Sequence, residues 1–258
     1  MRLFAFVEYD GTEFEGFQVQ ARQRTVQGEL ESALHKITGE TSRITGGGRT
    51  DSGVHALGQG AHWDTHWERP LPVLERALNA VLPNDIAVRG LREVPPDFSA
   101  RYSARSRMYR YTILNQPTRS PVAQRYALHV AEQLDVMAMR AAAQCLVGKH
   151  DFGAFGRPPH GDNTVREMFK ANVERDETRV WVDLQANAFL YRMVRRIVGT
   201  LLMVGKGGMT LTQFRQVLAQ ERRAGPPAPP QGLCLVAVEY DLTNKSAIRF
   251  IGAKDENF

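Results

Sequence analysis

Apolar residues recur along the chain at two spacings, which predict strands and helices in alternation. Short apolar segments rich in aromatic and β-branched residues predict strands at residues 2–9, 56–64, 86–94, 107–114, 164–175, 179–186 and 232–242. Apolar positions three and four residues apart predict helices at residues 26–37, 70–82, 132–147, 188–205 and 211–222. This order predicts a mixed α/β (α+β) fold with two lobes, residues 1–104 and 105–258, joined near residues 100–106.

Capping residues support several of these helices. Thr25 is placed to cap the helix that begins at residue 26, and Gly39 to end it. Thr210 and Gln213 have the spacing of a capping box. The segment GPPAPPQG, residues 225–232, predicts a rigid, extended linker into the last strand.

With 258 residues, of which 43% are hydrophobic, the chain is long enough to bury a sizeable core. Its formal charge is +5, and only six of its 33 basic residues are lysines. Arginine makes planar, bidentate contacts with phosphate and stacks on bases, so the bias favours a nucleic-acid partner. A bias in the genome would produce the same excess of arginine, and both explanations stay open here.

Cys145 and Cys234 lie far apart and form no C-x-x-C pair, so the sequence predicts neither a disulfide framework nor a zinc ribbon. His55, His62 and His66 raise the question of a metal site, but residues 55 and 62 would point to opposite faces of one strand. We therefore expect no metal. No segment approaches 18 uninterrupted apolar residues and the N-terminus shows no signal-peptide pattern, which predicts a cytoplasmic protein.

The segment GGGRTDSG, residues 46–53, is the strongest candidate for chemistry. It matches neither a P-loop nor a dinucleotide fingerprint, which disfavours nucleotide triphosphate binding. One interpretation is a turn in which Asp51 caps its own backbone. The other is a catalytic loop in which bare glycine backbone lets a polar substrate reach Asp51, while Arg49 and loop amides keep the carboxylate ionised. An ionised carboxylate suits a nucleophile or a base rather than a general acid.

Residues 188–205, as a helix, would place Arg192, Arg195 and Arg196 opposite an apolar stripe. A solvated basic face is one interpretation of this cluster. The alternatives are contact with a phosphate backbone, or one arginine turned inward to hold the catalytic carboxylate.

Strand spacing at residues 107–114 places Tyr109 and Tyr111 on the same face. Tyr109 is then either a half-buried strand aromatic or, with Tyr111 and the interleaved Arg107 and Arg110, part of a base-stacking platform.

Nine segments of the chain, taken in order, resemble the tRNA pseudouridine synthase A family. They are YDGTEFEGFQVQ, TVQGELESAL, GGGRTDSGVHALGQGAH, the LN and LP pairs around Asn79 and Pro83, FSAR with RMYRYTI, GKHDFGAF, TVRE, NAFLYRMVRRIVGTLLMVGKG and AGPPAPPQGLCL. The resemblance spans nearly the whole chain. It implies isomerisation of uridine to pseudouridine at positions 38, 39 and 40 in the anticodon stem-loop of tRNA. It also implies a homodimer, and two ferredoxin-like lobes whose sheets form a central basic cleft.

The resemblance places the family's catalytic aspartate at Asp51 and its partner in the same motif at Arg49. It places the active-site tyrosine at Tyr109 and the arginine of the helix segment at Arg195. These positions imply that Asp51 attacks the sugar, that Arg49 holds the flipped nucleotide, that Tyr109 stacks on the uracil, and that Arg195 pairs with Asp51. The reaction requires no metal, redox carrier or activated donor, so no cofactor is expected.

Two positions depart from the family pattern, Ser52 where alanine is usual and Gly60 where a β-branched residue is common. Neither position carries a group that does chemistry, so the departures bear on local rigidity. Two other classes of function stay open on the residues alone. An RNA-binding module would keep the arginines and aromatics without depending on Asp51, and a metal-dependent nuclease would use the histidines and lose activity in chelator.

Overall fold

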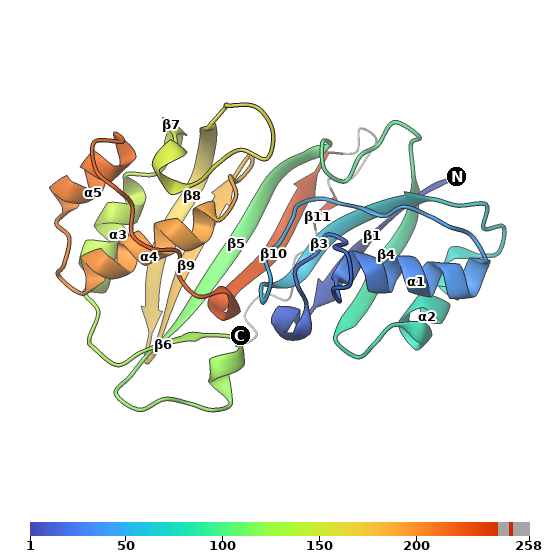
Figure 1. Cartoon of the computed structure of the whole chain (residues 1–258), viewed down its shortest axis with the longest axis horizontal. Helices are drawn as coiled ribbons and strands as arrows, with labels where there is room; N and C mark the ends of the chain where they lie inside the picture. The colour runs from blue at the N-terminus through green and yellow to red at the C-terminus, as the bar shows by residue number, and fades with distance from the viewer. Residues whose placement is uncertain (242–247, 250–258) are drawn as a thin grey trace. The chain divides into compact units, whose positions relative to one another are not determined.

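The computed structural model describes residues 1–241 and the strand residues 248–249. The chain folds into two compact units, and Figure 1 labels the helices and most of the strands. The first unit consists of Met1–Arg105 and the segment that begins at Leu235, and the second of Ser106–Cys234. The expected division had assigned that last segment to the lobe 105–258. The mixed α/β fold class is confirmed.

The first unit is built on a sheet with the strand order β4-β1-β3-β10, in which β1 pairs antiparallel with both β3 and β4. Its strands are β1 (Arg2–Tyr9), β3 (His55–Asp64), β4 (Ile86–Val94) and β10 (Leu233–Tyr240), with the short strands β2 (Thr45–Gly46) on β3 and β11 (Ile248–Arg249) on β10. All residues from Leu3 to Val7 in β1 are buried, so both faces of this strand are covered. The centre of the first core is therefore β1.

Two helices, α1 (Val26–Thr38) and α2 (Leu71–Val81), and the 3-10 turn η1 (Gly11–Glu13) complete the first unit. The Thr25 side chain accepts a hydrogen bond from the Gly28 amide, and Gly39 ends α1 in the left-handed conformation. Both predicted ends of α1 are thus confirmed.

The second unit is built on an antiparallel sheet with the strand order β5-β9-β8-β7, to which β6 adds in parallel on β5. Its strands are β5 (Ala104–Asn115), β6 (Leu128–Val130), β7 (Gly148–Asp151), β8 (Val165–Asp176) and β9 (Arg179–Ala186). Its helices are α3 (Val136–Gln144), α4 (Met193–Gly205) and α5 (Leu211–Leu218), with 3-10 turns η2 (Ala123–Arg125), η3 (Gly153–Phe155) and η4 (Pro230–Gly232). The three helices pack on one another, and α3 packs on β8 (Figure 1). In the described part of the chain, no helix is long and apolar enough to cross a membrane.

The longer predicted elements are all present, but several bounds differ. The helix predicted at residues 188–205 begins only at Met193, because Arg192 has a left-handed backbone conformation with φ of 59°. The helix predicted at residues 132–147 is limited to α3, and the short strands β2, β6 and β7 were not predicted. The capping box of Thr210 and Gln213 is confirmed at α5. The last residue of the predicted strand 232–242 lies outside the described residues.

Tyr240 of β10 fills the core of the first unit. Its ring packs edge-to-face on Phe4, with centroids 5.1 Å apart, and against Phe98 at 5.4 Å. The Tyr240 hydroxyl donates a hydrogen bond of 2.8 Å to the carbonyl oxygen of Ala100. A Cβ atom at Gly60 would collide with this hydroxyl. Gly60, where the resemblance led us to expect a β-branched residue, is therefore glycine because Tyr240 occupies the space of its side chain.

We expect Gly60→Ala to destabilise the protein by about 1–3 kcal/mol, the usual cost of overpacking a core. Urea denaturation measures the free energy of unfolding. Gly208→Ala is the matched control, because a Cβ there meets only the Met203 carbonyl oxygen at 3.5 Å. In a Tyr240→Phe background the cost of Gly60→Ala should shrink, and additive effects would contradict the collision.

Candidate active site

The loop between β2 and β3, which contains the GGGRTDSG segment, is held against β3 at its beginning. The Gly47 amide donates to the carbonyl oxygen of Gly60 at 2.7 Å. The side chain of Gln59, which is fully buried, binds Gly48 on both sides: Oε1 accepts from the Gly48 amide at 3.2 Å, and Nε2 donates to the Gly48 carbonyl oxygen at 2.8 Å. The backbone that leads to Asp51 is thus fixed by three hydrogen bonds.

Packing inside the first unit explains two of the three consecutive glycines. A Cβ atom at Gly46 would collide with the ring of Phe17, and one at Gly47 with the hydroxyl of Tyr240. The sequence had suggested that the bare backbone admits a substrate. At Gly46 and Gly47 the close neighbours are side chains of the protein itself, so these glycines are required by the fold.

Thr50 is an internal anchor between the two charged residues of the loop. Its side chain is buried and its Oγ1 lies 2.7 Å from the Tyr9 hydroxyl, while its carbonyl oxygen accepts from the Phe17 amide at 3.2 Å. Arg49 is exposed and Asp51 is half-buried. Because these contacts hold Thr50 in place, the backbone positions of its neighbours Arg49 and Asp51 are also restricted.

A turn follows Asp51 directly. The Val54 amide donates to the Asp51 carbonyl oxygen at 3.2 Å, and the Gly53 amide donates to Phe14 at 3.2 Å. Gly53 has φ of 75°, which favours glycine. This turn is formed by the backbone carbonyl of Asp51, whereas the first interpretation expected its side chain as the cap, and the turn fixes the Cα–Cβ direction of the carboxylate.

The second unit holds the other two predicted site residues, on β5 and α4. Tyr109 is 7% exposed and meets the ring of Phe189 edge-on, with centroids 5.1 Å apart. Tyr111 is fully buried, its hydroxyl donates to the carbonyl oxygen of Pro229 at 2.8 Å, and burial raises its pKa. Tyr111 is therefore a core residue and no part of a stacking platform.

Arg110 does not serve such a platform either. Its guanidinium forms two hydrogen bonds, of 2.8 and 3.0 Å, with the buried carboxylate of Asp183 on β9. The hydrogen bond to Asp183 raises the pKa of Arg110. The guanidinium carbon also lies 5.3 Å from the centre of the Trp181 ring. This arginine is thus held within the sheet by a bidentate ion pair.

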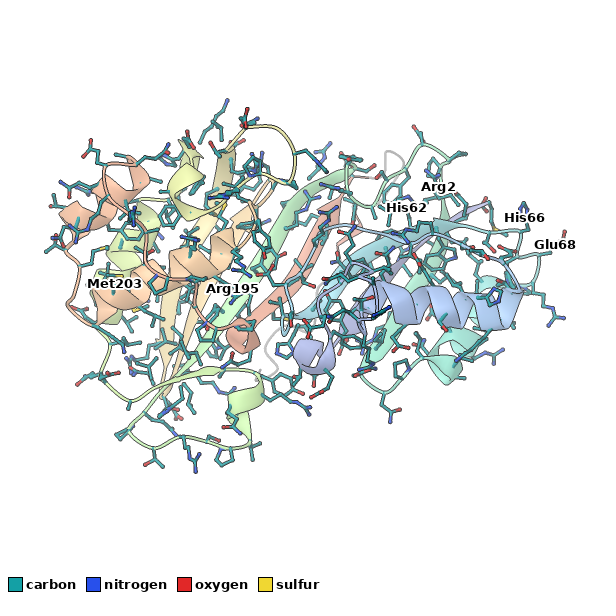
Figure 2. All side chains as sticks on the ribbon, viewed as in Figure 1. Arg2, His62, His66, Glu68, Arg195 and Met203 are labelled. Atoms are coloured by element: carbon teal, nitrogen blue, oxygen red, sulfur yellow. The ribbon has the colours of Figure 1, made fainter. Side chains whose placement is uncertain are left out.

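Arg195 is clamped to the proline-rich segment that precedes β10. Its Nε donates to the carbonyl oxygen of Ala228 at 2.7 Å, and the Ala228 amide donates to the Arg195 carbonyl oxygen at 2.8 Å. At Gly199, one turn further along α4, a Cβ atom would collide with the carbonyl oxygen of Pro226. The segment predicted as a linker is therefore packed on α4, and it orients the Arg195 side chain, which is labelled in Figure 2.

The three-arginine stripe expected on this helix is wrong in part. Arg192 lies before the helix, is exposed, and places its guanidinium carbon 4.9 Å from the centre of the Tyr191 ring. Arg195 and Arg196 are half-buried, because α4 is covered on most sides. Only Arg192 fits the solvated face.

The three histidines considered for a metal site have different surroundings. The Nδ1 atom of His55 accepts a hydrogen bond from the Gly11 amide at 3.0 Å, and that of His62 accepts from the Ala100 amide at 3.1 Å. His66 is exposed. Among the residues that the structure describes, no three His, Cys, Asp or Glu side chains gather into a group that could hold a metal ion.

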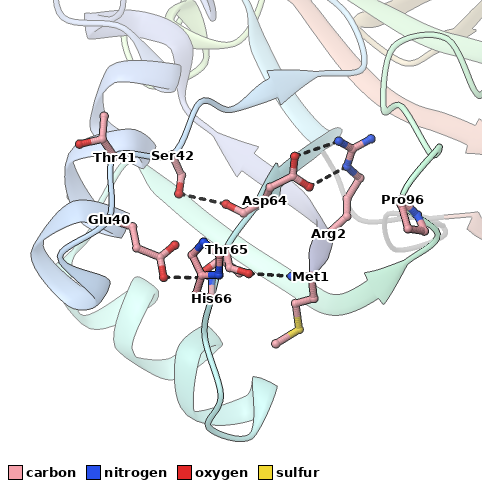
Figure 3. A pocket seen from close by; sticks show the side chains of 9 residues that line it. All are labelled: Met1, Arg2, Glu40, Thr41, Ser42, Asp64, Thr65, His66 and Pro96. Carbon is pink, nitrogen blue, oxygen red and sulfur yellow. Dashed lines mark hydrogen bonds and ion pairs between the residues drawn. The ribbon is translucent and has the colours of Figure 1, made fainter.

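A surface hollow of about 590 Å³ lies at the N-terminus, and none of the predicted site residues lines it (Figure 3). Its charged groups are hydrogen-bonded within the hollow: Arg2 forms two 2.9 Å hydrogen bonds with Asp64, and the N-terminal amino group donates to the Thr65 carbonyl oxygen at 2.8 Å. The Glu40 carboxylate accepts from the His66 amide at 3.0 Å. The hollow is thus a structural junction and is not assigned to the chemistry.

Sequence reasoning missed the supporting residues Gln59, Thr50 and Tyr240. Gln59 could have been found as a polar residue inside the apolar segment ALGQGAH. Tyr240 could have been found only indirectly, because a glycine inside a strand, here Gly60, indicates that another residue lies close to the backbone. The sequence contains no signal for the pairing of Thr50 with Tyr9.

Comparison with known proteins gives a consistent set of matches. A family model described as tRNA pseudouridine synthase matches residues 5–103 and 142–241, which include Arg49, Asp51 and Arg195, whereas Tyr109 lies between the two ranges. The tRNA pseudouridine synthase A of Brevibacillus brevis is 45% identical over 242 residues, covering 93% of this chain and 99% of that protein. The protein of that name from Chloroflexus aurantiacus is 49% identical over 248 residues, covering 93% and 89%.

The buried side chain of His62 makes the stability of the first unit depend on pH. Burial, followed by the charge of Arg2, lowers the pKa of His62 below its usual 6.5. Above that value the imidazole is neutral in both states. As the pH falls below it, the unfolded chain takes up a proton that the folded chain refuses, so the free energy of unfolding falls until the pH passes the folded pKa. We expect this decline, measured by urea denaturation between pH 7 and pH 5, to be smaller in His62→Asn.

The exposed His66 supplies the control for that experiment, since His66→Asn should leave the decline as steep as in the parent. Equal slopes for the parent and His62→Asn would contradict the assignment.

Proposed function

The chain belongs to the tRNA pseudouridine synthase family, and from that premise we propose that it isomerises uridine to pseudouridine in the anticodon stem-loop of tRNA, at positions 38, 39 and 40. The observation that carries this proposal is the extent of the match. Relatives named tRNA pseudouridine synthase A are 42–49% identical over 91–93% of this chain. The proposal further includes a cytoplasmic homodimer that needs no cofactor.

The chemistry requires one ionised carboxylate. Isomerisation breaks the N1–C1′ bond, turns the freed uracil and joins C5 to C1′, so that no atom is gained or lost apart from the proton that leaves C5 and the one that N1 takes up. Uracil is a tolerable leaving group, so the second carboxyl group of a glycosidase is not needed. We assign the role of nucleophile at C1′ to Asp51. The alternative first step, removal of the C2′ proton to give a glycal, would use the same carboxylate.

Support for Asp51 comes from the way its loop is built. Gln59 and Thr50 fix the backbone before the carboxylate, and the turn to Val54 fixes it afterwards. A carboxylate held in place needs no reorganisation when the bond to the sugar forms, which lowers the barrier.

We assign substrate binding to Arg49, Tyr109 and Arg195. The target base has to leave the stack before the reaction, and this unstacking costs free energy that protein contacts must offset. The exposed Arg49 is suited to hold the flipped nucleotide through its phosphate. Tyr109 stacks on the uracil and assists proton loss from C5, and the clamp on Ala228 holds Arg195 in one orientation for the substrate.

The test of this function is a tritium-release or mass-resolved assay on an unmodified tRNA transcript. Chelator should leave the rate unchanged once the effect of magnesium on tRNA folding is controlled. Binding without isomerisation would favour an RNA-binding module, and loss of activity in chelator would favour a metal-dependent enzyme.

Asp51→Asn should bind tRNA as the parent does and should not isomerise it, because an amide is neither a nucleophile nor a base. The single-turnover rate and the dissociation constant are measured on the same preparation. Asp97→Asn, which alters an exposed carboxylate of the same unit, should be fully active. A rate for Asp51→Asn within about tenfold of the parent, a little over 1 kcal/mol in the barrier, would rule out the catalytic assignment.

Tyr109→Phe keeps the ring that stacks on the base and the contact with Phe189, but loses the hydroxyl. We expect normal binding and a rate at least about a hundredfold lower, the scale of a general acid–base group. Tyr109→Leu should impair catalysis with the fold intact.

The control for a lost buried hydroxyl is Tyr111→Phe. It removes the hydrogen bond to Pro229 and should lower the melting temperature without a comparable loss of rate. If Tyr109→Phe turns over at the parental rate and both Tyr109 variants melt early, Tyr109 is a structural residue.

A further inference from the structure

The loop that follows β4, residues 95–103, carries the most exposed aromatic ring in the described part of the chain. Tyr102 is 80% exposed. A single exposed apolar side chain needs no functional explanation. The loop beneath this ring, however, is anchored far more firmly than a loop that only connects two strands.

The anchor is Ala100, whose backbone is held from both sides by buried side chains. Its amide donates to Nδ1 of His62 at 3.1 Å, and its carbonyl oxygen accepts from the Tyr240 hydroxyl at 2.8 Å. His62 is 9% exposed and Tyr240 is 2% exposed. Burying a polar side chain costs free energy unless it forms a hydrogen bond, and here two buried polar side chains both bind the backbone of one loop residue.

Ser99 and Ser103, which lie on either side of Tyr102 in the sequence, close the loop into a tight turn. The Ser103 amide donates to the carbonyl oxygen of Ser99 at 2.8 Å, and the Ser99 amide donates to Oγ of Ser103 at 3.0 Å. The Tyr102 amide donates to Oγ of Ser99 at 3.4 Å. The backbone of Tyr102 is therefore already ordered, and a ligand that binds the ring would lose little additional conformational entropy.

The charge beside the ring identifies the kind of ligand. The guanidinium carbon of Arg101 lies 5.4 Å from the centre of the Tyr102 ring. An aromatic face next to a guanidinium is suited to a nucleotide, because the base stacks on the ring and the cation attracts the phosphate. The excess of arginine over lysine in the chain fits the same partner.

We propose that Tyr102 is a stacking platform for an exposed base of the tRNA substrate, with Arg101 contributing positive charge beside it. This inference rests on the proposed function, since it takes tRNA as the ligand. It adds a binding residue outside the GGGRTDSG loop, in a segment that the sequence predicted only as the connection between the two lobes.

The platform is tied to the loop of Asp51 through one side chain. The Tyr240 hydroxyl that holds Ala100 also lies against Gly47, which is three residues before the Thr50 anchor. All of these residues belong to the first unit. A base stacked on Tyr102 would therefore be held in a fixed position relative to the Asp51 loop.

The experiment compares Tyr102→Ala, Tyr102→Leu and Tyr102→Phe with the parent, all as full-length protein with an unmodified tRNA transcript. We expect Tyr102→Ala to weaken binding about tenfold, in the range of one stacked base, with Tyr102→Leu close to it and Tyr102→Phe close to the parent. Because stacking is not ionic, the slope of affinity against salt should stay unchanged, whereas Arg101→Gln should flatten it. Melting temperatures should not change, since the ring is exposed.

Kinetics separate this role from a catalytic one. Loss of ground-state binding should raise KM with little change in kcat. Met137→Ala, which removes a side chain that is 69% exposed on α3, is the control and should bind normally.

Three results would overturn the platform: parental affinity in Tyr102→Ala, parental affinity in Tyr102→Leu together with a loss in Tyr102→Ala, or unchanged RNA binding with loss of self-association in sedimentation. The last result would assign Tyr102 to a contact between copies of the chain. If the parent isomerises uridine but Tyr102 is neutral, this inference alone fails. If the parent does not isomerise uridine, the proposed function fails, and a Tyr102-dependent affinity for tRNA would still support the platform.

Discussion

The hydroxyl of Tyr240 is the contact on which the first unit depends. It donates to Ala100, and there is no room for a side chain at Gly47 or Gly60 because the hydroxyl occupies that space. One buried oxygen atom thereby sets the path of the loop that leads to Asp51, the path of β3 and the path of the loop after β4. Because interiors are close-packed, moving this atom would shift all three segments together. The residue comes from β10, so the core of the first unit includes a strand that lies after the whole second unit in the sequence.

In the second unit, backbone carbonyl oxygens rather than a buried side chain hold the site residue Arg195 in place. Proline has few accessible conformations in the unfolded chain, so the segment 225–229 loses little entropy when it packs on α4. Its carbonyl oxygens remain available as acceptors, and Arg195 and Tyr111 use two of them, at Ala228 and Pro229. A segment that has the composition of a linker is thus a template for a charged side chain.

The sequence predicted what is local. The caps of α1 at Thr25 and Gly39 depend on neighbours within a few residues, and the strands depend on a spacing of two. The reasons for the glycines could not be predicted, because the atoms that exclude a side chain at Gly47 belong to a residue almost two hundred positions away. Arg49 and Asp51 were singled out from the local pattern of their loop, and the resemblance added their roles, while their supports are long-range contacts that leave little trace in a single sequence.

Composition also overstated what arginine does in this protein. Arg2, Arg24 and Arg110 each form bidentate pairs with a carboxylate, and those hydrogen bonds raise the pKa of all three. The planar geometry that makes arginine a phosphate ligand is the geometry that these structural pairs use. An arginine count therefore cannot separate the two roles, but position can. Arg192 lies against the exposed ring of Tyr191 in the second unit, and Arg101 lies against the exposed ring of Tyr102 in the first. An exposed ring next to a guanidinium is suited to stacking on a base, and the proposed platform at Tyr102 rests on this geometry rather than on the number of arginines.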